Sequence, residues 1–452
     1  MQAGAQDYRM QYAVTLFEEA DLAAAIEETT TALPDTSFRN RAWFMVFSAM
    51  LCTMCCSTAV MLINVGVFLT PLAETFSWNR GDIVLSLSIA AISMAAANPV
   101  AGRLIDVFGV RPVLIASMVL YGLAVAATPF LVNLWGLPGL YVAYALIAGL
   151  GAGSNVIAYV RLLSGWFTGP MNGSRGLALG ISSAGLPLGT VFTAPVGVLL
   201  IDQFGWEGGY YGLALLPLCL GLPIAMFLIR PAPHEHATSK NGADAKAAPL
   251  PGLTVNQALK TRAFWLLVTI ALLMSSCLQG IAIHTAPLLS DFGTSAQLLA
   301  IILAADGVLG IVGRVGAGYL FDKFFAPHIS LLIFGTAAAA AFAFVGMPTF
   351  TVAVIATMFI TLGSGAESDF IGYLIGRYFG LRNYGQIFGL VYAMFMVGIA
   401  LGPFLFGVAF DKWGDYSIPY IMAGVGLSGI CVLLFFLPNF SKEAELISEG
   451  MP

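Results

Sequence analysis

A few charged side chains lie inside long apolar stretches of this 452-residue chain. Asp306 and Arg314 share one such stretch, and Glu367 and Asp369 share another. A charge at the depth of a membrane costs several kcal/mol unless it is paired or hydrated, so each of these residues needs a specific role. A carboxyl group in an apolar cavity can hold a proton near neutral pH. The alternative for Glu367 and Asp369 is an ion pair with Arg314 or Arg377, and the alternative for Asp306 is a buried hydrogen bond.

The segments that carry these residues are predicted to be membrane-spanning helices. The composition is 59% hydrophobic and only 10% charged, whereas soluble globular proteins carry about 25% charged residues. Apolar stretches of roughly 20 residues, the length of a helix that crosses a bilayer, recur along almost the whole chain. The alternating segments of about ten residues that mark a membrane β-barrel are not seen. We therefore expect an all-α integral membrane protein with no sizeable soluble domain.

Hydropathy and helix-breaking residues predict twelve helices in two sets of six. The first set spans about residues 42–71, 79–101, 111–133, 138–164, 175–202 and 209–230. The second set spans about residues 262–289, 296–320, 328–347, 350–377, 384–411 and 416–438. These helices define two bundles, 39–230 and 262–438, joined by a polar linker at 231–261. The tails are 1–38, in which Tyr8 to Glu28 has a helix-like pattern, and 439–452.

The positions of the basic residues predict the orientation of the helices. Of the 19 Lys and Arg residues, all but Arg80 and Lys412 fall in or beside the tails, the linker and the loops on the N-terminal side of the membrane. Basic loops remain on the cytoplasmic side, so we expect a multi-pass protein of the cell (inner) membrane with both termini and the linker in the cytoplasm. The net charge of −5 indicates no nucleic-acid partner.

A short loop motif occurs twice and indicates a duplication. Gly102-Arg103-Leu104-Ile105-Asp106 is followed by Arg111, and its Gly-x-Leu-x-Asp pattern returns 216 residues later as Gly318-Tyr319-Leu320-Phe321-Asp322. Two further pairs of short motifs recur at offsets of 212 and 209 residues. The chain is therefore predicted to be a tandem duplication of a six-helix unit. Many secondary transporters use two such halves to open one site alternately to either side of the membrane.

The repeated loop resembles the cytoplasmic signature of the major facilitator superfamily, over residues 42–438. The resemblance implies that the Asp and Arg of the loop pair and act as a latch that holds neighbouring helices in one conformation. The latch residues are then Gly102, Arg103, Asp106, Arg111, Gly318 and Asp322. Within the superfamily, residues 66–80, 166–189 and 284–293 resemble the monocarboxylate transporter and oxalate/formate antiporter branch. The second of these stretches contains Trp166-Phe167 and Arg175-Gly176-Leu177-Ala178-Leu179-Gly180.

The resemblance to this branch implies that Arg314 binds the carboxylate of a substrate, because Arg314 precedes Gly318 at the spacing of the family motif. A tether between helices is the alternative role for Arg314. The acidic position of the family is occupied by Gly310, and Asp306 lies one helical turn before it. His284, near the outer end of the seventh helix, can hydrogen-bond a substrate or relay protons, or it can stabilise the helix end.

The superfamily resemblance also implies that the fourth and tenth helices line a central cavity. Arg161 on the fourth helix is then an anion anchor or a gate partner of Glu367, unless its side chain only reaches the membrane surface. Tyr159 and Asn155 are its companions. Glu367 occupies the position equivalent to Asn155 in the first half, so it is the first candidate for proton coupling. Residues two apart on a helix point in different directions, so only one of Glu367 and Asp369 is expected to face the cavity squarely.

The sequence thus predicts a secondary active transporter of a small organic anion, a carboxylate, with a proton as the coupling ion. Sodium coupling, anion exchange and export of amphipathic drugs or metabolites are the alternatives within transport. A transport-incompetent sensor or a membrane enzyme would need a signalling domain or a catalytic cluster, and neither is found. The six cysteines lie in apolar segments without clustered metal ligands. We therefore expect no cofactor, no catalytic or metal-binding residues, and a functional monomer.

Overall fold

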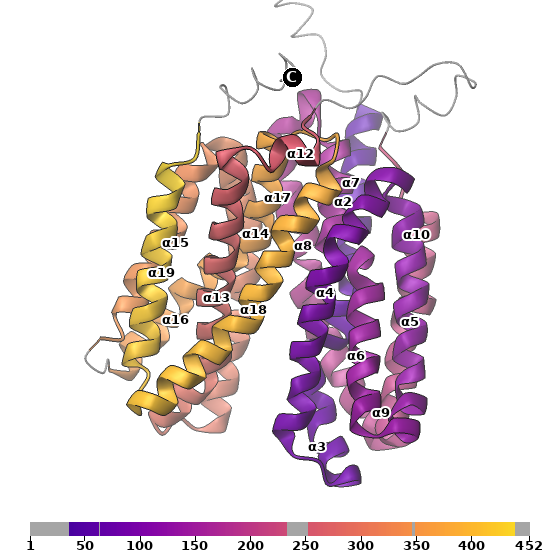
Figure 1. The fold of residues 1–452 in the computed structure, drawn as a ribbon, viewed down its shortest axis with the longest axis vertical. Helices are drawn as coiled ribbons and strands as arrows, with labels where there is room; N and C mark the ends of the chain where they lie inside the picture. Colours follow the sequence, from indigo (N-terminus) through magenta and orange to yellow (C-terminus); the bar gives the residue numbers. More distant parts are fainter. Residues whose placement is uncertain (1–35, 63, 233–251, 346–348, 439–452) are drawn as a thin grey trace, which may run out of the picture.

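The computed structural model describes residues 36–62, 64–232, 252–345 and 349–438. These described residues form a bundle of long helices and contain no β-strand (Figure 1). The helix-like stretch from Tyr8 to Glu28, most of the linker and the tail 439–452 lie outside the described residues.

Helices α2 to α10 belong to the first half of the chain. They are α2 (Thr36–Met54), α3 (Val65–Phe76), α4 (Arg80–Phe108), α5 (Val110–Trp135), α6 (Leu137–Gly151), α7 (Val156–Trp166), α8 (Arg175–Ser183), α9 (Gly185–Leu215) and α10 (Leu222–Phe227). Short 3-10 or π-helical segments between them are η1 (Thr58–Leu62), η2 (Ala152–Ser154), η3 (Gly169–Ser174) and η4 (Leu216–Gly221).

The second half supplies the helices from α12 onward. They are α12 (Val255–Ala258), α13 (Arg262–Asp291), α14 (Ala296–Lys323), α15 (Ala326–Phe342), α16 (Phe350–Gly365), α17 (Glu367–Tyr378), α18 (Tyr384–Trp413) and α19 (Ser417–Phe435).

The number of membrane spans follows from the lengths of these helices. Ten helical stretches in the described part of the chain are long and apolar enough to cross a membrane. One of them, Arg175–Phe227, has 53 residues and contains two helices that meet at Gly205, where φ is 72° and ψ is 179°. A further apolar helix, Ala326–Phe342, has 17 residues. Dividing the long stretch at Gly205 and including the shorter helix gives the twelve predicted passes, and the prediction of an all-helical membrane protein is confirmed.

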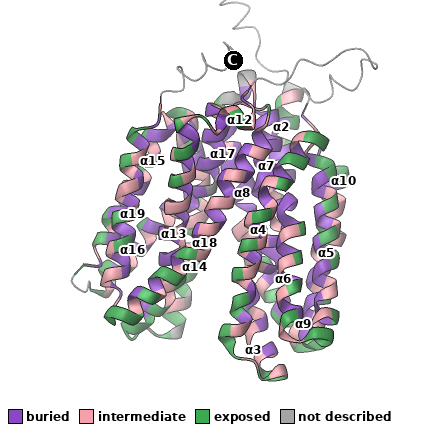
Figure 2. Cartoon of the chain, in the orientation of Figure 1, coloured by how far each residue is buried: buried purple, intermediate pink, exposed green. Residues whose placement is uncertain are grey.

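Exposed residues lie along the outside of the helices (Figure 2), and many of them are large and apolar, as a surface that contacts lipid requires. Phe130, Phe227 and Phe435 are 65%, 73% and 72% exposed. In water, so many exposed aromatic and aliphatic side chains would drive association. The helices are therefore apolar on most faces, and their polar side chains are concentrated where the helices pack against each other.

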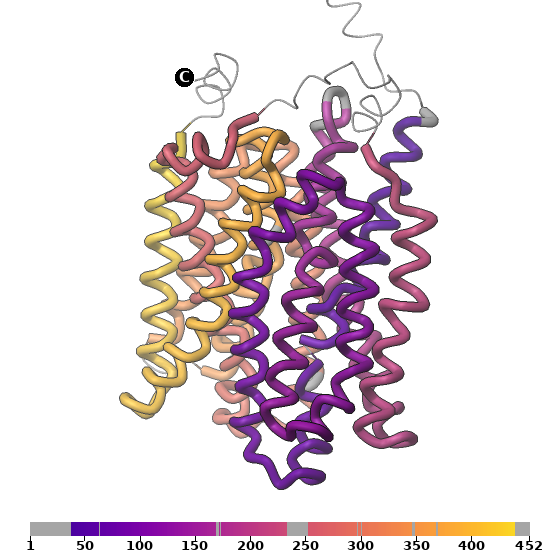
Figure 3. The backbone as a smooth tube through the Cα atoms, turned by 45° about the vertical axis from the view of Figure 1, so that its right-hand side comes forward, coloured from indigo at the N-terminus to yellow at the C-terminus, as the bar shows by residue number. Residues whose placement is uncertain are grey.

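The two sets of helices meet at one end of the molecule and diverge toward the other (Figure 1). The end where they meet is the one at which α2 begins and α19 ends (Figures 1 and 3), and we call it the closed end. The principal contacts between the sets join α4 to α18 and α8 to α14. These two contacts are related by the duplication, because α4 and α14 carry the two copies of the repeated motif.

Glycines of the repeated motif allow the backbones to touch at the closed end. A Cβ atom on Gly102 would overlap the carbonyl oxygen of Gly385 on α18, and a Cβ atom on Gly318 would overlap the carbonyl oxygen of Gly176 on α8. Small residues permit this close packing of membrane helices. The two motif glycines thus occupy equivalent places in two pseudo-symmetric contacts.

The fourth span is interrupted and the tenth is distorted for one turn, although the sequence predicted both as continuous helices. In the fourth, α6 ends at Gly151 and α7 begins at Val156, with Asn155 extended at φ −91° and ψ −169°. In the tenth, α16 ends at Gly365 and α17 begins at Glu367, and Ala366 between them keeps right-handed angles of φ −85° and ψ −13°, so the helix is distorted for one turn without changing direction sharply. Glycines before each of these points weaken the helix. Interrupted helices in transporters commonly mark the binding site.

Candidate functional site

Two acidic residues lie in the first turn of α17, immediately after the distortion in the tenth span. Glu367 is 5% exposed and Asp369 is 1% exposed. Oε1 of Glu367 accepts a hydrogen bond of 3.2 Å from the amide of Gln279 on α13. Oδ2 of Asp369 accepts a hydrogen bond of 2.6 Å from the hydroxyl of Ser183 on α8. The hydrogen bond to Asp369 therefore joins the two halves of the chain.

Each of these carboxyl groups has one oxygen that remains unsatisfied. Oε2 of Glu367 and Oδ1 of Asp369 are buried and have no hydrogen-bond partner among the described residues. Buried polar atoms are nearly always paired in folded proteins, because an unpaired one loses its hydration without compensation. A ligand that donates hydrogen bonds would satisfy these oxygens, and a bound proton would remove the negative charge of the carboxyl group that carries it.

Arg314 on α14 contributes the positive charge of this site. It interacts electrostatically with both Glu367 and Asp369. Tyr392 on α18 is 6% exposed and interacts with the same three charged groups. We call these residues the central cluster: Arg314, Glu367, Asp369, Gln279, Ser183 and Tyr392. They come from α8, α13, α14, α17 and α18, so the cluster lies where both halves meet.

The central cluster contains three residues that the sequence singled out and three that it missed. Arg314, Glu367 and Asp369 were visible as charges within apolar stretches. Gln279, Ser183 and Tyr392 are single neutral polar residues, which are common in membrane helices, so the sequence carried no comparable signal for them. Both acids are buried, and each accepts a hydrogen bond from a different helix, so these hydrogen bonds do not decide which of the two faces the cavity.

Asp306 has a different environment from the central cluster. It is partly buried on α14 and interacts with the hydroxyl of Thr361 on α16. Its charge also acts on Tyr420 of α19. Oδ1 of Asp306 is buried without a hydrogen-bond partner in the described structure. These interactions all lie within the second half.

The candidate residues of the fourth span face the first half or the closed end. Asn155 at the break accepts a hydrogen bond of 3.0 Å from the Thr58 hydroxyl and donates one of 3.0 Å to the Ser57 hydroxyl. Tyr159 is 2% exposed, and its hydroxyl has no partner within the described part of the chain. Nε of Arg161 lies 3.8 Å from Oδ1 of Asp106. Arg161 is 5% exposed, so its side chain is buried at the closed end and does not reach the membrane surface.

His284 lies within the second half, near the start of α19. Its Nε2 is 3.2 Å from the carbonyl oxygen of Pro403 on α18. Its ring stacks on Phe406 and lies beside Tyr416, with centroid distances of 5.7 Å and 5.8 Å. These contacts hold α13, α18 and the start of α19 together, which is the structural alternative considered for His284.

The closed end is held by the two aspartates of the repeated motif. Oδ1 and Oδ2 of Asp106 accept hydrogen bonds of 2.8 Å from the backbone N–H groups of Gly385 and Gln386 in the first turn of α18. Oδ1 and Oδ2 of Asp322 accept hydrogen bonds of 2.7 Å and 2.8 Å from the N–H groups of Gly176 and Leu177 in the first turn of α8. A carboxylate is favoured at a helix N-terminus by the exposed N–H groups and the helix dipole.

The basic residues of the first motif copy, Arg103 and Arg111, have other environments than the contact between Asp106 and α18. Arg103 is exposed on α4. Arg111 donates a hydrogen bond to the carbonyl oxygen of Met226 on α10. The resemblance had implied a pairing of Asp with Arg within the loop, but the ion pair recorded for Asp106 is with Arg161 of the fourth span. The aspartates instead cap helices of the opposite half, because the glycine contacts bring those helix ends next to them.

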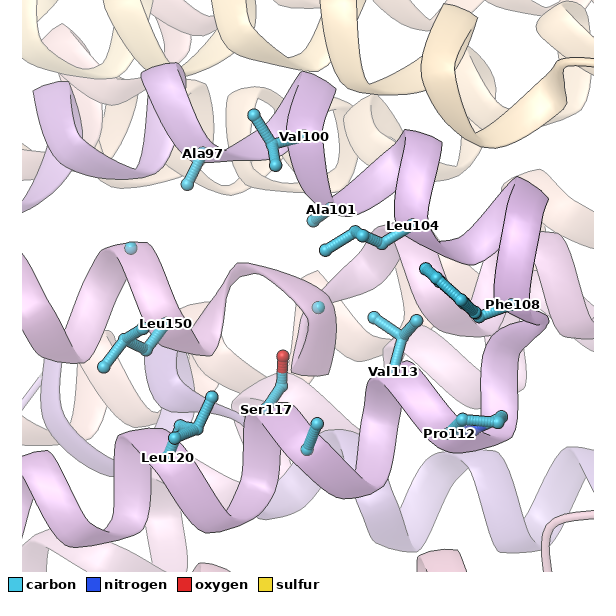
Figure 4. A pocket seen from close by; sticks show the side chains of 13 residues that line it. Ala97, Val100, Ala101, Leu104, Phe108, Pro112, Val113, Ser117, Leu120 and Leu150 are labelled. Carbon is cyan, nitrogen blue, oxygen red and sulfur yellow. The ribbon is translucent and has the colours of Figure 1, made fainter.

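A cavity of about 610 Å³ lies between α4, α5 and α6 (Figure 4). Its lining is apolar, and Val100 and Phe108, which contribute to it, are 58% and 64% exposed. Of the labelled side chains only Ser117 presents an oxygen there. The cavity contains no member of the central cluster and no charged residue, so it is unsuited to a small anion.

The comparisons with known proteins agree with this architecture. The sequence profile of the Major Facilitator Superfamily matches residues 49–368, which is more than half of the chain. The protein therefore belongs to the Major Facilitator Superfamily, whose members are membrane transporters and not enzymes.

Within this superfamily, the chain is similar to monocarboxylate transporters along most of its length. It is 26% identical to monocarboxylate transporter 13 of Bos taurus, over 85% of this chain and 89% of the relative. It is 24% identical to monocarboxylate transporter 4 of Rattus norvegicus, over 85% of this chain and 83% of the relative. The resemblance found in the sequence motifs is thereby confirmed.

Solved structures show the same fold at low sequence identity. The fucose:proton symporter FucP of E. coli is 17% identical, with a TM-score of 0.64 over 88% of this chain and 99% of that one. The proton:xylose symporter XylE is 14% identical, with a TM-score of 0.68 over 88% of this chain and 96% of that one. These similarities confirm the fold of the major facilitator superfamily.

Proposed function

We propose that this protein is a secondary active transporter of a small organic anion, a carboxylate, and that protons drive the transport. The observation that carries the proposal is the central cluster, in which one arginine interacts electrostatically with two buried acids. The names of the similar relatives support a monocarboxylate as the substrate class. A forked guanidinium suits a carboxylate, because it can donate two parallel hydrogen bonds.

The charges of the central cluster explain why a proton is needed. With Glu367 and Asp369 both ionised, the cluster has more negative than positive charge, and an approaching carboxylate is repelled. A proton on either acid removes one negative charge, so that the positive charge of Arg314 can attract the substrate. Charge compensation of this kind lowers the cost of placing an anion at the depth of the membrane. Substrate and proton therefore favour each other's binding.

Helix α8 connects the central cluster with the closed end. It has nine residues, and it begins at Arg175 beside the Asp322 contact and ends at Ser183, which donates its hydroxyl to Asp369. A proton on Asp369, or a substrate beside it, weakens the Ser183 hydrogen bond because a neutral carboxyl is a poorer acceptor. The released α8 can then separate from α14. Ligand binding shifts the equilibrium between the two conformations in this way.

The proposed orientation places the closed end in the cytoplasm. The distribution of Lys and Arg supports cytoplasmic termini, because basic residues concentrate on that side. We place the protein in the cell (inner) membrane as a functional monomer. In this orientation the aspartate-capped contacts are a cytoplasmic gate, and the described conformation is the one in which this gate is shut.

The test is uptake by proteoliposomes that contain the purified protein. Labelled mono-, di- and aromatic carboxylates are offered with and without an inward proton gradient. We expect accumulation of at least one monocarboxylate that is driven by the proton gradient and abolished by a protonophore. Accumulation that depends on sodium, or only on a preloaded anion, would replace proton symport by sodium symport or anion exchange. Absence of carboxylate transport under every gradient would refute the proposed substrate class.

A further inference from the structure

Two arginines from opposite halves of the chain lie near the same tyrosine ring at the closed end. Arg175 begins α8 in the first half, and Arg377 lies near the end of α17 in the second half. Their guanidinium carbons lie 6.0 Å and 5.3 Å from the centre of the Tyr373 ring. Arg175 is only 5% exposed, and its guanidinium packs so closely on Gly376 that no side chain would fit there.

The hydrogen bonds of these arginines are incomplete. Nη2 of Arg175 donates to the Ser164 hydroxyl at 2.7 Å, and Nη2 of Arg377 donates to the Tyr373 hydroxyl at 3.1 Å. Nε of Arg175 and Nε of Arg377 are both buried without a partner within the described ranges. Two neighbouring guanidinium groups thus retain buried donors that could bind an acceptor.

No carboxylate forms an ion pair with either arginine in the described part of the chain. The charge of Asp322 acts on both Arg175 and Arg377. Its two oxygens, however, already accept the N–H groups of Gly176 and Leu177. Two positive charges therefore share one aspartate that is engaged elsewhere. Arg175 also begins a helix, where the positive end of the helix dipole disfavours a cation and attracts an anion.

When the gate opens, Arg175 loses still more of the groups that compensate its positive charge. Its contacts with Tyr373, Gly376 and Asp322 all cross from the first half to the second, so they are lost when the halves separate. Only the hydrogen bond to Ser164 lies within its own half. A guanidinium deprived of its partners then lies on one wall of the opened pathway, with Arg377 on the other. An anion between the two walls would restore the lost interactions.

We propose that Arg175 and Arg377 form a second anion site, which holds the carboxylate of the substrate at the cytoplasmic end of the pathway once the gate opens. The site lies eight residues along α8 from Ser183, which is about 12 Å at the rise of an α-helix. A substrate that leaves Arg314 could therefore pass to a second cation without entering an uncompensated region. This inference rests on the proposed function, because it takes the transported carboxylate as the ligand.

The test compares the affinity for the substrate on the two sides of the membrane. Proteoliposomes with the protein in one orientation report external half-saturation from uptake and internal half-saturation from efflux of a labelled monocarboxylate. For Arg175→Gln we expect the internal half-saturation concentration to rise roughly tenfold, as for the loss of one charged hydrogen bond, and the external one to remain unchanged. Arg175→Lys should recover part of the loss. Arg41→Gln, an exposed arginine on α2, is the matched control and should change neither value.

Other results would overturn the second site. A shift in the gate equilibrium alone would move the internal and external half-saturation concentrations in opposite directions. Unchanged internal half-saturation in Arg175→Gln would also refute the site. Arg377→Gln, on the opposite wall, should also raise the internal half-saturation concentration and leave the external one unchanged. This variant tests the second site if Arg175→Gln does not reach the membrane. These results differ from a failure of the proposed function, in which the unmodified protein would transport no carboxylate from either side.

Discussion

Asp106 and Asp322 lie 216 residues apart at equivalent positions of the two repeats, and each accepts two backbone N–H groups from the first turn of a helix in the opposite half. Each aspartate is therefore a cap that exists only when the two halves are in contact. The duplication places the two caps at the same end of the molecule, beside the two glycine contacts. The closed conformation thus has two equivalent attachments, and both must break for the gate to open.

Neutralising either cap should weaken the closed conformation. In Asp322→Asn one oxygen is replaced by an amide that cannot accept from a backbone N–H, so the closed state should lose about 1–3 kcal/mol. Spin labels at Phe108 and Lys323, two exposed positions at this end in opposite halves, should report a larger population of long distances. Asp106→Asn should act similarly, and Asp202→Asn, which alters an exposed aspartate, should have no effect. An unchanged distance distribution in both variants would contradict the capping role.

A methyl group at the motif glycine should prevent closure. A Cβ atom on Gly318 would overlap the carbonyl oxygen of Gly176, whereas a Cβ atom on Gly316, two residues earlier on α14, would meet nothing within 4 Å. We expect Gly318→Ala to reduce uptake at least tenfold and to separate the same two spin labels. Gly316→Ala should retain normal uptake, since alanine is the better helix former. Equal activity of the two variants would mean that the backbone contact is dispensable.

Removal of the arginine in the central cluster should abolish substrate binding. Arg314→Gln should reduce carboxylate uptake to background while the protein remains folded, because the variant lacks the cation that the anion requires. Arg314→Lys should restore only part of the rate, since lysine lacks the forked donor geometry. Arg80→Gln, at an exposed position, is the control. Normal uptake by Arg314→Gln would exclude this residue as the anchor of the anion.

The two buried acids should determine the pH dependence of uptake. A transporter that must bind a proton together with its anion works faster as external pH falls, so uptake should rise on acidification. A neutral side chain mimics the protonated acid, so Glu367→Gln or Asp369→Asn should remove the pH dependence of uptake. Counterflow, which needs no net proton movement, should survive better than accumulation. Glu74→Gln, on an exposed surface of α3, should keep the normal profile. A full pH dependence in both variants would mean that another residue binds the coupling proton, and Asp306 would be the next candidate.

The hydroxyl that joins the two halves at the central cluster can be tested with its neighbour as the control. Ser183→Ala removes the hydrogen bond to Asp369, a charged hydrogen bond of about 1.5–3 kcal/mol. We expect the gate to open more readily, which the spin labels would report as a larger open population at neutral pH. Ser182 is also buried, but its hydroxyl bonds to the carbonyl oxygen of Leu179 within α8. Ser182→Ala should therefore leave the distance distribution unchanged, and an equal response would rule out a specific link.

The sequence by itself determined the membrane-spanning helices, the duplication and the charged candidates of the central cluster. Long apolar stretches require helices in a bilayer, because every backbone polar group must be paired internally. The repeat offset was enough to place Asp106 and Asp322 at the same end. Glu367 and Arg314 were conspicuous because a charge is rare and expensive within an apolar span.

Only the tertiary structure decided which of these groups meet. It placed Arg161 beside Asp106 at the closed end. It also brought Ser183 to Asp369, although the two residues are 186 positions apart in the chain. Helices in a membrane are apolar on most faces, so hydropathy does not reveal which face packs against which neighbour. The contacts that operate the gate depend on the packing of the two halves, and local sequence patterns do not encode that packing.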